Sequence, residues 1–232
     1  MEAEMALLGT AAMAMFFDVA PEAVAEHDDW HTHEHMPERL SIPGFLRGSR
    51  WTAVSAEQRY FVLYEVAEVA VLSSAAYLER LNHPTPWTAK IMPSYRGMRR
   101  GFCRVERSFG LGLGGDALSV RLSPQPGKET SLRAWLTEQV MPGLASKPGL
   151  AGAHLLQAAA APSMTREQQI RRKDAGMDWL LLVTGYSSDA LKSLRDGELR
   201  SEPLRRHGAA QDPAAGIYRL GYFLTAQPPL KP

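Results

Sequence analysis

Residues 30–44 read WHTHEHMPERLSIPG, and residues 135–149 read WLTEQVMPGLASKPG. The two stretches agree without a gap at a Trp, a Thr, a Met-Pro pair, a Ser and a Pro-Gly pair. A segment that recurs at a wide spacing indicates a duplicated structural unit whose two copies fold alike. We therefore predict that the 232 residues form two domains, residues 1–110 and residues 111–232.

The two copies differ where chemistry would take place. The first copy has histidines and a glutamate that the second has lost: Leu136, Glu138, Val140 and Gly143 stand in the places of His31, His33, His35 and Glu38. Both copies keep the residues that pack the helix and make its closing turn. This pattern predicts one copy with a working site and one degenerate, structural copy.

Hydrophobic periodicity predicts the same order of elements in both copies. In the first copy we expect strands at 12–19, 47–54, 60–66 and 101–107, and helices at 21–40 and from 73 or 74 past 81. In the second copy we expect strands at 118–122, 152–160, 179–185 and 217–225, and helices at 131–145 and 189–195. The glycine-rich residues 111–116 are expected to link the copies.

The order βαββαβ is that of the ferredoxin-like fold. A four-stranded antiparallel sheet with both helices on one face leaves its other face apolar and uncovered, so two such sheets can cover each other. We therefore predict an α+β protein with two ferredoxin-like βαββαβ repeats packed sheet to sheet as an intramolecular α+β barrel. Residues 162–176 are inserted in the middle hairpin of the second copy, and their mixed charges predict a mobile surface loop.

At this point the sequence resembles the dimeric α+β barrel superfamily, and within it the EthD-like proteins. In these proteins a helix-borne His-x-Pro precedes a Pro-Gly turn into the second strand, and the matching residues here are His35, Met36, Pro37, Pro43, Gly44 and Phe45. The resemblance covers the element order of residues 12–107. It implies an enzyme of the isomerase, cyclase, lyase or monooxygenase type, and haem occurs in relatives of this fold.

The composition of the chain argues against nucleic acids and membranes as partners. The net charge of +1 gives neither half the basic field that nucleic-acid binding needs. No apolar run reaches the roughly 20 residues required to span a bilayer, and Glu2 and Glu4 stand where a signal peptide has basic residues. The single cysteine, Cys103, fits a reducing compartment. We expect a cytoplasmic internal pseudo-dimer that binds a small apolar organic molecule, with pairing into a further homodimer left open.

The helix predicted at 21–40 carries four of the seven histidines. Spacings of three and four place a titratable stripe on one face, consisting of His27, His31, Glu34 and Glu38, with Trp30 and His35 at its margins. The opposite face is expected to hold His33, Met36 and Leu40. A histidine beside a carboxylate can accept and return protons near neutral pH. We expect His35 as the principal base or acid, His31 as its partner, and Glu34 or Glu38 as the orienting carboxylate.

The walls of the site are expected to come from other elements as well as this helix. The candidate substrate-binding residues are Trp30, Tyr64, His83, Trp87 and Arg50. The Tyr64 hydroxyl is suited to orienting a carbonyl or a phenol. His83 and Trp87 lie near the break in the second helix and are candidates to face the histidines; in the alternative, Asn82, Pro84 and Pro86 only form the turn and Trp87 belongs to the core. Arg50 is a candidate anion clamp with Arg39.

The same pattern allows other interpretations. In a structural one, His27 and His33 are exposed and the remaining two helix histidines are partly buried, hydrogen-bonded side chains. A divalent metal is a second, with His31 and His35 as ligands and Glu34 or His27 as the third, although the pattern H-E-x-x-H is absent. Haem ligated by one histidine is a third, without an attachment motif. The leading prediction is cofactor-independent acid–base chemistry, with a non-catalytic ligand-binding or stress-associated barrel as the alternative.

Overall fold

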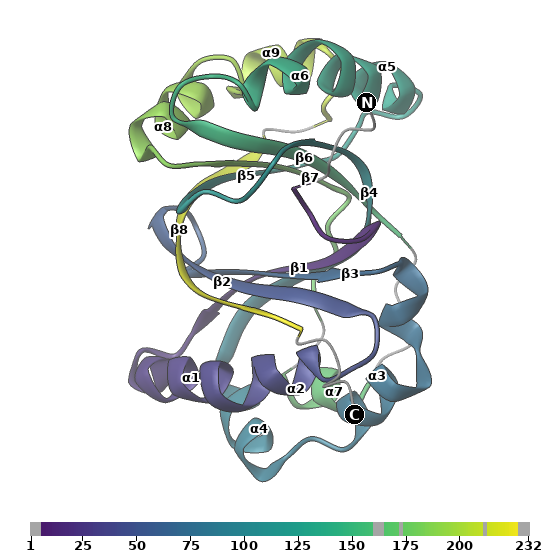
Figure 1. Cartoon of the computed structure of the whole chain (residues 1–232), viewed down its shortest axis with the longest axis vertical. Helices are drawn as coiled ribbons and strands as arrows, with labels where there is room; N and C mark the ends of the chain where they lie inside the picture. The colour runs from purple at the N-terminus through teal and green to yellow at the C-terminus, as the bar shows by residue number, and fades with distance from the viewer. Residues whose placement is uncertain (1–5, 160–164, 172–173, 211–212, 227–232) are drawn as a thin grey trace, which may run out of the picture.

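A closed barrel of eight strands forms the centre of the molecule, with helices on two opposite sides (Figure 1). The structure is a computed structural model and describes residues 6–159, 165–171, 174–210 and 213–226. The first half contributes β1 (Ala11–Val19), β2 (Phe45–Ser55), β3 (Tyr60–Val66) and β4 (Tyr95–Gly110). The second half contributes β5 (Asp116–Leu122), β6 (Leu150–Ala158), β7 (Trp179–Gly185) and β8 (Ala214–Thr225).

The strand order shows that the two halves share one topology. Around the barrel it is β1-β3-β2-β8-β5-β7-β6-β4. The first half therefore forms the sheet β4-β1-β3-β2 and the second half the sheet β8-β5-β7-β6, which is the same order. Antiparallel pairing of β2 with β8 and of β4 with β6 joins the sheets into a closed barrel. The predicted fold class, a tandem ferredoxin-like α+β barrel, is confirmed.

The helices lie on the outer faces of the two sheets (Figure 1). The first half has η1 (Pro21–Ala23), α1 (Val24–Trp30), η2 (His31–His35), α2 (Met36–Leu40), η3 (Val69–Ser73), α3 (Ala75–Asn82), α4 (Pro86–Ile91) and η4 (Met92–Ser94). The second half has α5 (Glu129–Ala134), η5 (Trp135–Val140), α6 (Met141–Leu144), α7 (Arg166–Arg171), α8 (Ser188–Asp196) and α9 (Ser201–Arg206). No described helix is long and apolar enough to cross a membrane.

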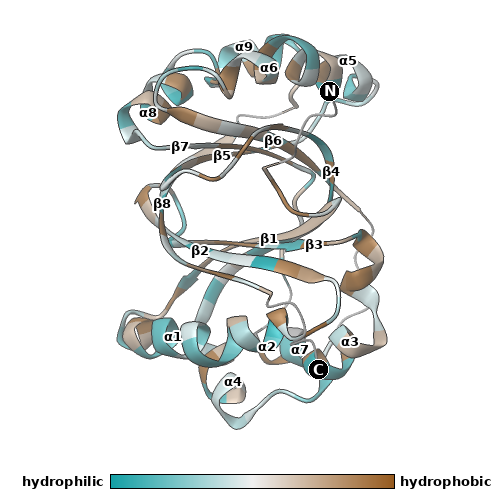
Figure 2. Ribbon diagram, in the orientation of Figure 1, coloured by the Kyte–Doolittle hydropathy of each residue, from teal (hydrophilic) through white to brown (hydrophobic). Residues whose placement is uncertain are grey.

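Three apolar layers hold these elements together. One lies inside the barrel and includes Phe16, Trp51, Phe61, Leu182 and Tyr218, with the first and third of these rings stacked at 4.7 Å. The other two lie between each sheet and its own helices. Figure 2 shows the strands β1 and β7 mostly in the hydrophobic colours. Successive side chains of each strand point alternately into the barrel and toward the helices, and both sets are largely apolar. The helices cover one face of each sheet, and closure of the barrel removes the other face from water.

A few polar side chains are enclosed with the barrel's apolar layer. His154 on β6 is fully buried, and its Nδ1 lies 2.7 Å from the Ser108 hydroxyl on β4. Burial lowers the pKa of His154 to about 3. Glu65 is also fully buried and accepts from the Arg47 guanidinium at 2.7 Å, which compensates its charge.

The insertion in the second half is the main departure from the predicted fold. Its described part contains α7, in which Glu167 is buried and Ile170 packs against the core of the first half. The prediction of a mobile surface loop is therefore wrong for this part, while residues 162–164 and 172–173 lie outside the described residues. The reason is that its partners, such as Arg39 and Arg100, belong to the other half of the chain.

Candidate functional site

Both copies have a π-helical turn at the same place in their first helix. In the first copy the Met36 amide donates to the His31 carbonyl, five residues back, and in the second Met141 donates to Leu136. A proline follows each of these methionines in the sequence. Proline has no amide hydrogen, and its ring clashes with the carbonyl four residues back, so a widened turn before it relieves the strain.

The extra residue in this turn rotates the following helix, so the buried face differs from the predicted stripe. The buried side chains are His27, Trp30, His31, His35, Met36, Arg39 and Leu40. The expectation that Met36 and Leu40 lie on the helix face opposite His27 and His31 is wrong, because all four are buried. The interpretation in which His27 is exposed is also wrong. Glu34 and Glu38 move to the margin of the buried face, because the prediction assumed regular spacings of three and four residues.

His31 is the most enclosed of the predicted acid–base residues. Its Nε2 lies 3.3 Å from the Tyr64 hydroxyl on β3, and its buried Nδ1 has no hydrogen-bond partner among the described residues. Burial holds the pKa of His31 well below its usual range, and the charges of His27, Arg50 and Arg39 add to this effect. The His31 imidazole is therefore neutral at pH 7. Burial also raises the pKa of Tyr64, so its hydroxyl stays protonated and can donate.

His35 and Trp30 lie beside this pair. Their ring centroids are 4.3 Å apart, and the rings of His35 and His31 are 5.6 Å apart. In its described contacts Glu34 accepts from the Trp30 indole at 3.0 Å and from the Thr85 hydroxyl at 2.6 Å. The structure thus places Glu34 as the residue that fixes the indole against the two imidazoles.

A second polar group, which sequence reasoning missed, surrounds His27. The Tyr95 hydroxyl lies 3.2 Å from Nε2 of His27, and Asp28 lies 3.2 Å from Nδ1. Asp28 also accepts from the Tyr60 hydroxyl at 2.9 Å and pairs with Arg50 at 3.6 Å. Burial lowers the pKa of His27, and Asp28 opposes this shift. Arg50 is therefore an anion clamp for a carboxylate of the chain itself. The sequence signal for this group was the alternation along β3, which places Tyr60 and Tyr64 on one face of the strand.

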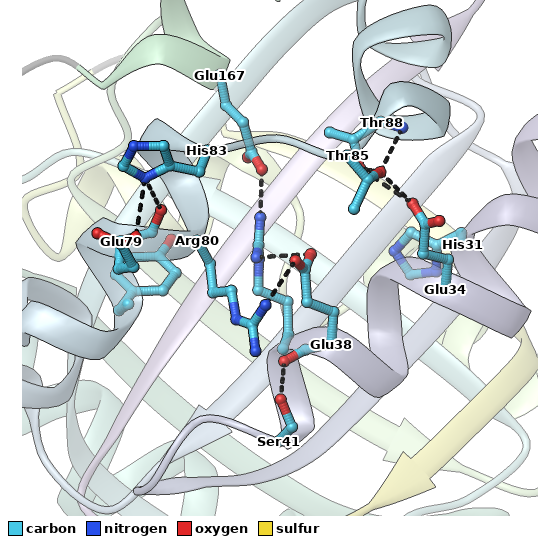
Figure 3. A network of polar contacts seen from close by, with 12 residues as sticks. His31, Glu34, Glu38, Ser41, Glu79, Arg80, His83, Thr85, Thr88 and Glu167 are labelled. Atoms are coloured by element: carbon cyan, nitrogen blue, oxygen red, sulfur yellow. Dashed lines mark hydrogen bonds and ion pairs between the residues drawn. The ribbon is translucent and has the colours of Figure 1, made fainter.

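Arg39 lies at the other end of the buried face. Its guanidinium donates to Glu167 at 2.5 Å and to Glu38 at 3.1 Å, and it lies 5.8 Å from the Tyr77 ring centroid. Figure 3 shows the Glu167 carboxylate on one side of this guanidinium and Glu38, with Arg80 beside it, on the other; the Arg80 guanidinium lies 3.9 Å from the Glu38 carboxylate. Burial opposes the charge of Arg39, but the carboxylates outweigh it and hold its pKa above the usual range. Burial raises the pKa of Glu38.

Two predicted wall residues do not join the buried histidines. The His83 side chain is 69% exposed, and its Nδ1 lies 3.0 Å from the Glu79 carboxylate (Figure 3). The Trp87 indole is half-buried and donates to Glu26 at 3.2 Å. His83 follows the last residue of α3, where the helix ends before two prolines, and this position turns the ring to solvent.

The equivalent place in the second copy is apolar. Leu136 and Val140 are buried in the core between the second sheet and its helices, as expected from their replacement of histidines. Trp135 is only partly buried, and its ring stacks on His207 at 4.1 Å. The assignment of the second copy as purely structural stays a prediction.

The described side chains do not make a metal site by themselves. No three His, Cys, Asp or Glu side chains converge in the part of the chain that the structure describes. Nε2 of His27 and Nε2 of His31 each lie at a tyrosine hydroxyl instead of facing one another. Cys103 is buried, and burial raises the pKa of its thiol to about 12, so the thiol is protonated at neutral pH.

The fold is shared with solved structures of low sequence identity. An anthrone oxidase-like protein superposes with a TM-score of 0.68 at 14% identity, over 95% of this chain and 94% of its own. A putative monooxygenase from Fusobacterium nucleatum gives 0.61 at 8% identity, over 94% and 96%. A putative chlorite dismutase gives 0.53 at 10% identity, over 93% of both chains. The sequence matches no protein-family model and no curated protein. The likeness shows the fold, a ferredoxin-like α+β barrel.

Proposed function

We propose that this protein is a small-molecule enzyme of the oxidase or monooxygenase kind, in which the histidines of η2 transfer protons. The observation that carries the proposal is His31, a fully buried imidazole whose Nδ1 has no hydrogen-bond partner among the described residues. Leaving such a polar atom unpaired in the core costs free energy, so its presence favours a role toward a ligand. The resemblance to anthrone oxidase-like and monooxygenase structures, and the EthD-like His-x-Pro at His35, support the same class.

The chemistry suited to this site is removal of a proton from carbon beside a carbonyl. A neutral His31 or His35 accepts the proton, and the Tyr64 hydroxyl donates to the oxygen on which negative charge develops. Trp30 is buried beside both imidazoles and would form the apolar wall for an aromatic ring. His35 as the principal base, His31 as its partner and Glu38 as a supporting carboxylate remain parts of this proposal.

Anthrone is a concrete probe, because its central CH₂ group lies between two aromatic rings and is made acidic by the carbonyl across the ring: the anion left by loss of a proton is conjugated through the rings with that carbonyl. Loss of one proton gives an electron-rich anion that transfers electrons to dioxygen and forms a carbon–oxygen bond. The resulting hydroperoxide loses water and gives anthraquinone, so that anthrone and O₂ yield anthraquinone and H₂O. The protein's contribution would be to hold the carbanion in a dry pocket beside a general base.

Two other candidates remain, a non-catalytic ligand-binding barrel and a haem or metal enzyme. The binding protein would bind anthrone without consuming oxygen. For haem, Nδ1 of His31 would be a candidate ligand, since it is a buried imidazole nitrogen without a hydrogen-bond partner among the described residues, and a bound haem would supply oxygen chemistry there. Absorbance of the purified protein in the Soret region distinguishes this case.

The test is anthrone-dependent oxygen uptake by the wild type and by matched histidine variants. We expect His31→Gln and His35→Gln to lower kcat/KM by about two to four powers of ten. His33→Gln is the matched control, because His33 belongs to the same turn but is exposed. Tight binding of anthrone with no oxygen uptake would favour the binding protein. Equal turnover in the wild type and both buried-histidine variants would contradict the proposed mechanism.

A further inference from the structure

The helix α7 belongs to the second half in sequence but to the first half in space (Figure 1). It lies beside α3 and η4, and Ile170 packs against the core of the first half. In the first copy the corresponding hairpin joins β2 to β3 through residues 56–59 alone. The second copy therefore lacks the histidines of this helix and carries a segment that reaches the histidine-bearing helix layer of the other copy.

The segment is fastened to the first half by a buried ion pair. Arg39 and Glu167 meet at 2.5 Å, and their side chains are only 1% and 2% exposed. Removing two charges from water is costly unless their geometry is good and other hydrogen bonds support them. Glu38 supplies that support through a second hydrogen bond to the guanidinium. The position of α7 is therefore tightly specified.

Further contacts fix the segment on both sides of this pair. Asp174 pairs with Arg100 at 3.0 Å, with both side chains buried. The Ala175 amide donates to the Met98 carbonyl at 2.9 Å. On the other side of α7, the Arg166 amide donates to the Asn82 side chain at 3.2 Å. These backbone and side-chain contacts hold α7 and the residues around it in one position against the first half, where they form one wall of its helix layer.

Arg39 connects this wall to the candidate site. It lies one helical turn after His35, and its positive charge is close enough to His31 and Tyr64 to act on both. Because Glu167 offsets this charge, the second half adjusts the electrostatics of the histidine site. Without Glu167 the guanidinium would keep Glu38 as its remaining carboxylate hydrogen-bond partner among the described residues.

We propose that the second half completes the site of the first: Glu167 is a positioning residue that holds Arg39 beside the His31–Tyr64 pair, and α7 closes this side of the site against water. The inference rests on the proposed function, because it treats the His31–Tyr64 pair as part of an active site, but its test does not require turnover.

The test measures the acylation of each histidine by diethyl pyrocarbonate, which reacts with accessible neutral imidazoles, using mass spectrometry. In Glu167→Gln we expect His31 and His35 to react at least tenfold faster than in the wild type. The exposed His33 and His83 calibrate the reagent in the same molecule. His154, buried in the barrel, reports global unfolding and should stay protected. Gln169→Ala, an exposed position of α7, is the matched control and should behave as the wild type.

The double variant Arg39→Gln/Glu167→Gln tests whether the effect of Glu167→Gln comes from leaving the Arg39 charge without its partner. Because neither charge remains, we expect His31 protection closer to the wild type than in Glu167→Gln alone. Unchanged acylation of His31 in Glu167→Gln would overturn the proposal. Equal acceleration at His154 would also overturn it, since the residue would then support the whole fold. These outcomes decide the role of Glu167 even if anthrone is no substrate.

Discussion

Replacing His154 tests how a neutral histidine in the barrel interior shapes stability against acid. The folded pKa of about 3 lies below the ordinary value of 6.5, so between these values the unfolded chain binds a proton that the folded chain does not. Stability is therefore retained above pH 6.5 and lost as the pH falls. From pH 7.5 to pH 4.5 the loss corresponds to about two pH units below the ordinary pKa at about 1.36 kcal/mol each, or about 2.7 kcal/mol from His154.

The perturbation is His154→Asn, whose amide can still bond to Ser108. The assay is urea unfolding, monitored by circular dichroism at pH 7.5 and pH 4.5. The dependence of the unfolding free energy on urea concentration should be the same for both proteins, so that the midpoints report stability. We expect the wild type to lose about 2.7 kcal/mol more than the variant between these two conditions. His83→Asn, at an exposed position, is the control and should keep the wild-type difference. An unchanged pH dependence in His154→Asn would refute the reasoning.

Three further predictions concern packing and ligands. Met36→Ala and Met141→Ala should each cost about 2–5 kcal/mol in urea unfolding, because both side chains are fully buried after a π turn; near-neutral values would contradict the buried face described. Gly48→Ala should cost about 1–3 kcal/mol, since a Cβ there would lie 3.0 Å from Met36 and from Tyr64, whereas Gly143→Ala, with open space around it, should not destabilise the fold. Elemental analysis of the purified protein should give less than stoichiometric zinc, iron or nickel; about one tightly held ion per chain, lost in His31→Ala, would contradict the cofactor-independent mechanism.

The sequence was sufficient for the architecture because the relevant signals are local or repeated. The Trp, Met-Pro and Pro-Gly positions recur without a gap, and they mark the same helix and turn in both halves. Strands β3 and β7 have the predicted bounds, since each is an apolar run with clear polar or glycine flanks. Strand β4 is longer than expected because it pairs with both β1 and β6, and pairing partners are not visible in a single segment.

The candidate site was predicted less completely, for two physical reasons. The π turn adds one residue between His31 and Met36, which moves every later side chain to a different face of the helix. Pro37 was the signal that could have indicated this irregularity. The burial of Glu167 depends on Arg39, which is far away in the sequence, so no local composition distinguishes α7 from an exposed charged loop.

The closure of the barrel within one polypeptide has a consequence for what each half can become. In a homodimer every substitution appears twice, and the interface forms only at sufficient protein concentration. Here the seams β2–β8 and β4–β6 join segments of a single molecule, so their association does not depend on dilution. Each half can also change alone. The second half carries Leu136 where the first carries His31, and it also carries the added helix α7, a division of labour that strict twofold symmetry forbids.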